Sequence, residues 1–337
     1  MKLSFDQIKS VATGCMEFVE DGGLWLHRFT EAQRNFTYSK SPNGMLQACQ
    51  AAGITLDFYT DATAFDMTVD GIRDYDNCNR CFDLLVDGCF VKSIDTLHMD
   101  EGFCKTPVPY GPYDLHFPLP QGEKRVTVCM PWDASVRILS AELTDGTFCR
   151  PHAYKRTLVA FGDSITHGAF AKYSCTPYIC QTARLLDAKL YNFGIGGERF
   201  RGNKIVPGSY PKADIVTVAY GTNDYSGQTK EAFEEKMPAF LRQLTAEFAE
   251  TPIFVILPLW RKMEAWEEEK HLGSLQTVRD RIAEECAKYP NITVCDGSKW
   301  VPHLKDFYGD SKWVHPNDLG MSHFAMGLSK AILQASP

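Results

Sequence analysis

The sequence lacks any long apolar run. A helix that crosses a membrane needs about 18 or more consecutive apolar residues, and polar residues interrupt every stretch well before that length. The opening segment MKLSFDQIKSVATG also lacks the apolar core of a signal peptide, because Asp6, Lys9 and Ser10 interrupt it. We therefore expect a cytoplasmic protein that has no membrane among its partners.

Basic residues are fewer than acidic residues. The chain of 337 residues has 35 Lys and Arg against 42 Asp and Glu, so its net charge is −7. Nucleic acid is excluded as a partner because its phosphates require a basic face. There is no internal repeat and no low-complexity segment. With 44% hydrophobic residues, the chain is long enough for two globular domains.

Cysteines are numerous, but they do not form a disulfide framework. The 12 cysteines are scattered over a long chain without an export signal, so we expect reduced thiols, several of them in the core. Cys78 and Cys81 have the spacing of half a zinc site. No second half follows at a suitable spacing, and we assign no metal.

The first half of the chain has the pattern of short antiparallel strands. Apolar and polar residues alternate in several runs, and Asp87-Gly88 between two of them is a strong hairpin signal. Such runs separated by turn residues predict an antiparallel, jelly-roll-like β-sandwich over residues 1–150. The runs are 53–61, 65–69, 81–91, 124–131 and 136–143.

The second half alternates between buried strands and amphipathic helices. The strand-like runs are 157–162, 189–194, 214–221, 252–259 and 291–297. The helix-like runs are 176–188 with Thr176 as its cap, 229–250 with Pro238 as a kink, 274–289, and 318–335 with Asn317 or Asp318 as its cap. This order predicts an α/β domain over 155–337: a flavodoxin-like, doubly wound, parallel five-stranded sheet.

Four polar or glycine-rich turns follow the predicted strands or precede the last helix. Ligands of a doubly wound sheet bind beyond the carboxyl ends of its strands, so these turns are expected to meet there. The first, FGDSITHG (161–168), places Ser164 after a strand, where its hydroxyl is open and its N–H can stabilise an oxyanion. A serine there can also be a simple helix cap.

The second and third turns offer hydrogen-bond donors. NFGIGGERF (192–200) resembles a phosphate loop, but its glycine spacing differs from that of dinucleotide-binding proteins and it follows the second strand. Its glycines also allow a backbone N–H to approach a reacting carbonyl oxygen. In YGTNDYS (220–226), Asn223 can donate to that oxygen through its amide, or form an Asx turn.

The fourth turn, KWVHPNDLG (312–320), brings in His315. This histidine precedes Pro316 and the last helix, and a loop at this point in the topology returns to the same edge of the sheet. An imidazole there can take the proton of Ser164 and later deliver it to a leaving alcohol.

These four blocks, in this order, resemble the SGNH hydrolase superfamily, also called GDSL esterases, over roughly residues 155 to 335. The resemblance implies that Ser164 is the nucleophile and His315 its base. It also implies an oxyanion hole formed by the N–H groups of Ser164 and Gly197 and the amide of Asn223. The family forms an acyl-enzyme and needs no metal or organic cofactor.

The sequence departs from the family pattern at one position. The family usually has an aspartate three residues before the histidine, and here that residue is Lys312, which cannot orient an imidazole. Asp310, two residues earlier, would substitute if the loop is bulged. Otherwise a backbone carbonyl would orient His315 in a Ser–His dyad, as in some carbohydrate esterases with this fold.

A β-sandwich before an SGNH domain resembles two-domain carbohydrate acetylesterases. Trp260 and Trp313 are expected near the site, either against the apolar faces of sugar rings or as packing between domains. Glu198 and Arg261 are candidates for binding sugar hydroxyls, and Asp163 joins them as a substrate-binding candidate. His167 is expected to be structural.

We therefore predict a serine esterase that removes O-acyl, above all O-acetyl, groups from a sugar or oligosaccharide. The alternatives are a general short-chain esterase or thioesterase, and a carbohydrate-binding protein with a degenerate site. The sequence leaves open whether the chain forms a homo-oligomer.

Overall fold

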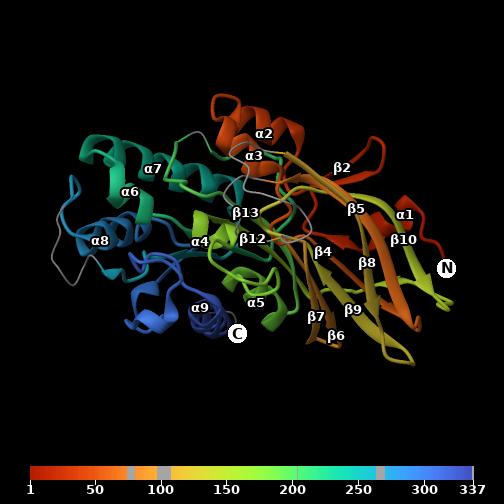
Figure 1. The fold of residues 1–337 in the computed structure, drawn as a ribbon. Helices are drawn as coiled ribbons and strands as arrows, with labels where there is room; N and C mark the ends of the chain where they lie inside the picture. Colours follow the sequence, from red (N-terminus) through yellow and green to blue (C-terminus); the bar gives the residue numbers. More distant parts are fainter. Residues whose placement is uncertain (74–79, 97–107, 203, 263–269, 336–337) are drawn as a thin grey trace.

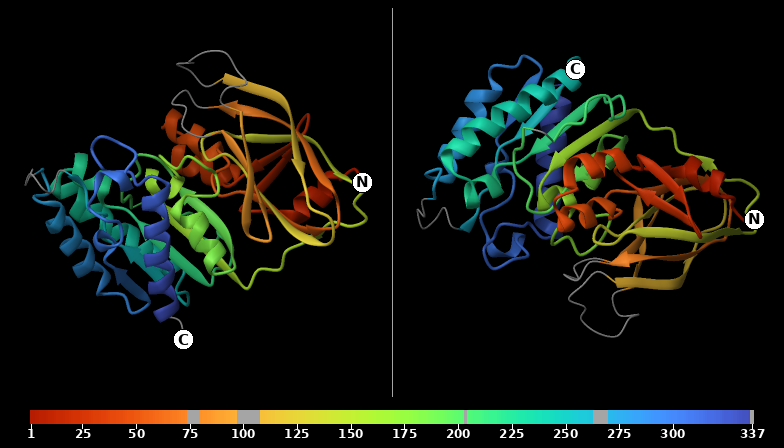
Figure 2. Two further views of the ribbon diagram at one scale, coloured as in Figure 1. Left: turned by 60° about the horizontal axis from the view of Figure 1, so that its bottom comes forward. Right: turned by 90° about the horizontal axis from the view of Figure 1, so that it is seen from above.

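The computed structural model describes residues 1–73, 80–96, 108–202, 204–262 and 270–335. Two antiparallel sheets from the first half of the chain lie beside a parallel sheet covered by helices from the second half (Figures 1 and 2). The predicted fold class, a β-sandwich followed by a doubly wound α/β region, is confirmed. The domain boundary between 150 and 155 stays a prediction.

The sandwich region pairs one sheet of order β1-β4-β9-β6-β7, with β11 beside β4, and a second of order β2-β3-β10-β5-β8. The predicted hairpin is β6–β7, and Asp87 and Gly88 both have positive φ in its turn. Aromatic and aliphatic side chains, Phe58 and Phe65 among them, fill the space between the sheets. The strands are β1 Ala12–Thr13, β2 Glu17–Glu20, β3 Leu24–His27, β4 Thr55–Thr60, β5 Ala64–Arg73, β6 Cys81–Val86, β7 Cys89–Asp95, β8 Val108–Pro118, β9 Lys124–Cys129, β10 Val136–Thr144 and β11 Arg150–Pro151.

The parallel sheet has the order β13-β12-β14-β15-β16. Its strands are β12 Arg156–Gly162, β13 Ala188–Gly194, β14 Ile215–Ala219, β15 Ile253–Ile256 and β16 Ile292–Cys295. The direction of winding reverses at β12, because β13 and β14 lie on opposite sides of it. The carboxyl end of β12 is therefore the topological switch point, where ligands of such sheets bind.

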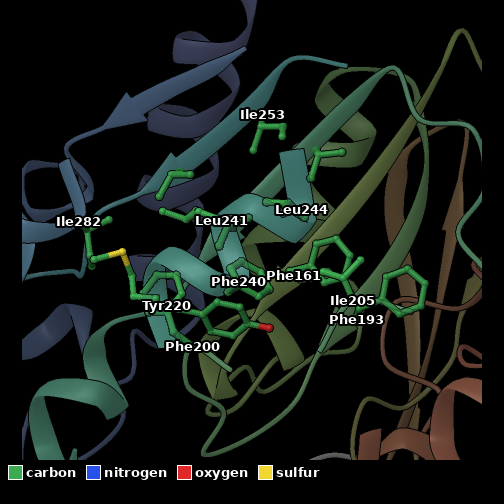
Figure 3. Packing of buried hydrophobic residues seen from close by; sticks show 14 of the residues in the cluster. Phe161, Phe193, Phe200, Ile205, Tyr220, Phe240, Leu241, Leu244, Ile253 and Ile282 are labelled. Carbon is green, nitrogen blue, oxygen red and sulfur yellow. The ribbon is translucent and has the colours of Figure 1, made fainter. Parts of the chain in front are cut away.

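Helices cover both faces of this sheet. Val159 and Phe161 of β12 pack with α7 (Lys230–Glu247) and α8 (Leu275–Cys286) in the cluster drawn in Figure 3. Leu158 and Ala160 point to the other face and pack with α5 (Tyr178–Leu185) and α9 (Asp318–Ala335). This alternation between two covered faces explains why the predicted strands are nearly all apolar.

The predicted helices are present, with one detail to correct. Thr176 is not the cap of α5, because its hydroxyl donates to the Tyr173 carbonyl (2.9 Å) and Pro177 occupies the cap position. Helix α7 contains Pro238 within its length, and the kink expected there stays a prediction. Asn317 caps α9 by accepting from the N–H of Leu319. The shorter elements on this side are α4 Ser164–His167, α6 Thr222–Gly227, η3 Gly297–Lys299 and η4 Lys305–Phe307.

Three helices of the first half were not predicted: α1 (Phe5–Val11), α2 (Glu31–Tyr38) and α3 (Pro42–Cys49). Helices α2 and α3 lie beside β13 in Figure 1, and Tyr38 and Ala48 pack into the core of the parallel sheet. The N-terminal half therefore contributes directly to the core of the C-terminal half.

Within the described residues, all ten cysteines are free thiols; Cys78, which has zinc-site spacing to Cys81 and to which we assign no metal, lies outside them. The described part of the chain contains no cluster of three or more His, Cys, Asp or Glu side chains suited to a metal ion. None of its helices combines the length and hydropathy that a membrane crossing requires.

Candidate active site

Ser164 lies at the switch point, as the first residue of the short helix α4 directly after β12. Asp163 caps this helix, because its Oδ1 accepts from the N–H of Ile165 (3.0 Å). Ser164 keeps partial exposure, whereas Ile165, Thr166 and His167 after it are buried. The strand–turn–helix junction thus presents one hydroxyl at the carboxyl edge of the sheet.

His315 comes from the loop before α9 and reaches this hydroxyl. Its Nε2 lies 2.8 Å from Ser164 Oγ, across 151 positions of sequence. The loop is closed by an isolated bridge between Tyr308 and Pro316 and by the Gly309 N–H donating to the His315 carbonyl (2.9 Å). A nucleophile and a base are therefore within hydrogen-bond distance without any rearrangement.

Asp310 orients the imidazole. Its Oδ2 lies 2.8 Å from His315 Nδ1 and also accepts from the His315 backbone N–H at 2.7 Å. Oδ1 accepts from the N–H of Lys312 (2.7 Å). Burial opposes ionisation, but the hydrogen bonds from His315 and from backbone N–H groups hold the pKa of Asp310 at about 2. The ionised carboxylate fixes the proton on Nδ1 and leaves Nε2 free to accept from Ser164.

The three expected oxyanion donors lie on turns that follow three neighbouring strands of the parallel sheet, β12, β13 and β14. Within the described residues, the backbone N–H groups of Ser164 and Gly197 have no hydrogen-bond partner. Asn223, on α6 after β14, donates one amide hydrogen to the Glu198 carbonyl (3.0 Å), and the second hydrogen of that amide has no partner there. These three groups therefore stay candidates for oxyanion donors at the carboxyl ends of adjacent strands.

The glycines of the second turn have separate structural causes. A Cβ on Gly194 would lie 2.6 Å from the backbone nitrogen of His167, so this glycine lets β13 approach the helix that carries Ser164. Gly197 has φ +76°, and a Cβ there would meet no atom within 4 Å. A glycine is required at this position because the backbone is left-handed, and that conformation sets the direction of the N–H.

Glu198 is not an open hydroxyl-binding residue, which corrects that expectation. Its side chain is buried and binds Lys204 Nζ and Arg201 Nε, both at 2.6 Å. Burial alone would favour the neutral acid, but the two cations bring the pKa of Glu198 to about 2. The carboxylate therefore stabilises the glycine turn from inside.

Arg261 and Asp163 also face inward and are corrected likewise. Arg261 is buried, donates to Ser226 Oγ (3.0 Å) and lies over the ring of Tyr225. Asp163 is only 2% exposed, and burial raises its pKa to about 6. Both side chains are therefore largely closed off from solvent, and the hydrogen bonds that they form are to the protein itself.

Trp260 and Trp313 remain at the carboxyl edge, half-buried. Their ring centroids are 5.9 Å apart, and Trp313 stacks on Tyr308 at 6.0 Å. Trp260 in turn stacks on His303 at 4.3 Å. Both tryptophans pack against the helix α5 and α9 side of the parallel sheet, so they do not fill the contact with the sandwich region.

Phe170 was missed by the sequence analysis. Its ring stacks on that of His315 with centroids 4.9 Å apart and 21° between the planes, yet the side chain is 40% exposed. Its φ of +69° is uncommon for a non-glycine residue. No local pattern marks Phe170, because the contact arises only when the loop that contains His315 folds back.

The comparisons with known proteins agree with this geometry. The model of the GDSL-like Lipase/Acylhydrolase family matches residues 160–322, which contain all four turns. This part of the chain belongs to the GDSL-like lipase/acylhydrolase family. It is accordingly a carboxylic ester hydrolase. No curated protein matches the sequence.

Solved structures with the same fold cover nearly the whole chain of this GDSL-type hydrolase. The salicylyl-acyltransferase SsfX3 from a tetracycline biosynthetic pathway is 18% identical over 97% of this chain and 95% of its own, with a TM-score of 0.79. A putative GDSL-like lipase from Bacteroides ovatus is 17% identical over 99% and 97%, with a TM-score of 0.73. A family two carbohydrate esterase from Clostridium thermocellum, in complex with cellohexaose, is 17% identical over 92% and 98%, with a TM-score of 0.60. At these identities the likeness shows a common fold.

Proposed function

We propose that this protein is a serine esterase that hydrolyses O-acyl esters of carbohydrates, with the acetyl group as the preferred acyl group. One observation carries the proposal: Ser164, His315 and Asp310 form a continuous chain of hydrogen bonds, each 2.8 Å long, at the switch point of the sheet. That arrangement makes a hydroxyl nucleophilic at neutral pH without a metal ion.

The reaction then proceeds in two steps. Ser164 Oγ attacks the ester carbonyl while its proton moves to His315 Nε2, and the negative oxygen is bound by the N–H groups of Ser164 and Gly197 and by Asn223. Collapse of this intermediate breaks the bond to the sugar oxygen, which takes the proton from His315. Water, which gives a proton to the same imidazole, next attacks the acyl-enzyme. The bond between the acyl carbon and Ser164 Oγ then breaks, Oγ takes the proton back from His315, and acetate leaves.

The aromatic groups beside the catalytic residues support a sugar as the alcohol. Trp260, Trp313 and Tyr308 form one contacting group next to the loop that holds His315. Aromatic faces bind the apolar faces of sugar rings and leave the hydroxyl groups in water. The similar fold of an esterase solved with cellohexaose is consistent with this class of substrate.

The alternatives predict different substrates. A general short-chain esterase or thioesterase would accept longer acyl chains and show no preference for sugars. A degenerate binding protein would bind the sugar and turn over nothing, but the intact hydrogen-bond chain from Ser164 to Asp310 argues against it. The likeness to an acyltransferase makes it worthwhile to add alcohol acceptors to the assay and test for transfer.

The test measures acetate release from acetylated oligosaccharides together with a 4-nitrophenyl ester series. We expect the wild-type protein to release acetate and the Ser164→Ala variant to have a kcat lower by about 10³-fold or more. Trp260→Ala should raise KM for the oligosaccharides about tenfold and change 4-nitrophenyl acetate hydrolysis little, because the proposal places the sugar, and not the 4-nitrophenyl group, against this ring. Trp25→Ala, a change at a tryptophan in β3 of the sandwich, is the matched control.

Each other outcome has a definite meaning. Preference for longer acyl chains without sugar deacetylation would replace the proposal by the general esterase. Turnover that survives Ser164→Ala would exclude the serine mechanism. Sugar binding without Ser164-dependent turnover on any ester would favour the binding protein.

A further inference from the structure

Arg28, from the first half of the chain, lies buried behind the glycine turn of the active site. It follows β3 directly, and its guanidinium donates to four backbone carbonyl oxygens. Nε donates to Gln50 (2.8 Å) and Nη2 to Gln47 (2.7 Å). Nη1 donates both to Asn192 (2.8 Å) and to Gly194 (2.7 Å). The last two carbonyls belong to the end of β13, where the turn with Gly197 begins.

The burial of this cation is costly. Arg28 is 1% exposed, and burial lowers its pKa to about 9. Its hydrogen-bond partners within the described residues include no carboxylate. A buried charge without a counter-ion is retained only where its hydrogen bonds are extensive. The planar fork of arginine, unlike the point charge of lysine, can hold two carbonyl oxygens on one nitrogen in a fixed geometry.

Gln47 of α3 makes a second contact with the same turn. Its Oε1 accepts from the N–H of Gly196 at 2.5 Å. A Cβ on Gly196 would lie 2.8 Å from that oxygen, so the glycine is what lets the glutamine approach. The neighbouring N–H, that of Gly197, is one of the two expected backbone oxyanion donors and lies one peptide away from this hydrogen bond.

A third contact holds the far side of the turn. Tyr38 of α2 donates its hydroxyl hydrogen to Glu198 Oε2 (3.0 Å). The carbonyl of Glu198 accepts from the amide of Asn223, the remaining oxyanion donor. Residues 28–47 thus contact the glycine turn at three positions, which are Gly194, Gly196 and Glu198.

We propose that Arg28 and Gln47 are positioning residues for the oxyanion hole, a role that rests on the proposed serine esterase function. Arg28 fixes the carbonyls of Asn192 and Gly194 away from the site. Gln47 engages the Gly196 N–H, so the Gly197 N–H is the one directed at the substrate oxygen. The N-terminal half is then part of the active site and not only a separate substrate-binding module.

Gln47→Leu is the sharpest test, because it removes one acceptor on a partly exposed helix. We expect kcat for 4-nitrophenyl acetate to fall about tenfold or more, with KM within about twofold of wild type. The affinity for an alkylboronic acid, which forms a tetrahedral adduct with Ser164, should fall by a similar factor. Gln33→Leu is the control for damage to the helices themselves, since Gln33 forms the capping box of α2 and donates to Ser209.

Arg28→Lys and Arg28→Met separate charge from geometry. If the fork is what positions the turn, both variants lose kcat and boronic acid affinity alike. If only the positive charge matters, Arg28→Lys keeps most of both, which would overturn the positioning role of Arg28. Arg137→Met removes another arginine of the sandwich, paired with Asp70, and serves as the control. Melting temperatures identify variants that do not fold, and Gln47→Leu then carries the test.

Failure of this proposal differs from failure of the proposed function. If wild type shows Ser164-dependent turnover and Gln47→Leu keeps its kcat and boronic acid affinity, the positioning role is wrong and the esterase stands. A raised KM with unchanged kcat would also overturn it, because Gln47 would then contact the substrate directly. An equal loss in Gln33→Leu would reduce the effect to general destabilisation. Absence of Ser164-dependent turnover would remove both proposals.

Discussion

Asp310 contacts His315 twice, because one carboxylate oxygen accepts both the Nδ1–H of the ring and the backbone N–H of the same residue. The remaining oxygen accepts from the N–H of Lys312. The loop between them is therefore wound around the carboxylate. This turn explains how an aspartate five positions before the histidine can stand where the family pattern has one three positions before it.

Asp310→Asn should lower kcat about 10²- to 10⁴-fold, because an amide cannot stabilise the imidazolium that forms during acyl transfer. Lys312→Ala should leave kcat within about twofold of wild type, since only its backbone N–H takes part in the loop. Steady-state kinetics with 4-nitrophenyl acetate measure both. Wild-type kcat in Asp310→Asn would instead establish a Ser–His dyad.

The position of the family aspartate gives a second check on this loop. Adding Lys312→Asp to Asp310→Asn should not restore activity, because the side chain at 312 is exposed while the carboxylate at 310 is surrounded by donors. Recovery of more than about tenfold in kcat would show that the loop can rearrange to the family spacing.

Phe170 is expected to hold the ring of His315 by stacking. Phe170→Ala should lower kcat about three- to tenfold, the size of a stacking contact worth about 0.5–1.5 kcal/mol. Because Phe170 has φ +69°, Phe170→Gly should be more stable than Phe170→Ala by about 1 kcal/mol while losing the same activity. Urea unfolding and kinetics on the two variants separate strain from stacking. Full activity in both would mean that the imidazole is held by Asp310 alone.

The two glycines of the second turn should respond differently to alanine. At Gly194 a Cβ would collide with the backbone of α4, so Gly194→Ala should lower the free energy of unfolding by about 3 kcal/mol or more. At Gly197 the space is open, so Gly197→Ala should cost only about 1 kcal/mol. Its kcat should nevertheless fall about tenfold, because the N–H is aimed by the left-handed backbone. Equal stability of the two variants would contradict this assignment.

The parallel sheet was predictable because burial on both faces leaves only apolar, β-branched runs for its strands. Every predicted strand of that sheet matches an observed one to within a few residues, from β12 to β16. Helices α2 and α3 were missed, although Thr30 with Gln33 forms a capping box and Ser41 precedes Pro42. Those signals are short, and each helix has only eight residues. The alternation of apolar and polar residues in the neighbouring strands therefore dominated the prediction.

The direction of a side chain was harder to predict than its position. Glu198 and Arg261 lie on the expected turns, but Lys204 and Ser226 draw them inward, and only the folded chain brings these partners together. The same holds for Arg28, whose bond to Gly194 spans 166 positions of sequence. Asp310 was identified beside Lys312 because a bulged loop could be weighed from the local sequence alone.

Asp224 links the site to the pH dependence of stability. It is fully buried beside Asn223, and burial raises its pKa to about 7. In the unfolded chain an aspartate carboxyl has a pKa of about 3.9. Between pH 4 and 7 this group therefore binds more protons in the folded state than in the unfolded state. The free energy of unfolding contributed by this group therefore falls as the pH rises through that window, at most by about 1.4 kcal/mol per pH unit.

Asp224→Asn removes this titration and keeps an oxygen to accept from the Phe200 N–H, which Asp224 Oδ1 binds at 3.2 Å. We expect the variant to gain stability relative to wild type as the pH is raised from 5 to 8, by about 2 kcal/mol or more. Urea unfolding at both pH values measures the difference. Asp6→Asn, at an exposed carboxylate of α1, is the control and should show no such change. A difference between Asp224→Asn and wild type that is constant with pH would mean that Asp224 is already ionised at pH 5, stabilised by the neighbouring Arg199 and by the Phe200 N–H.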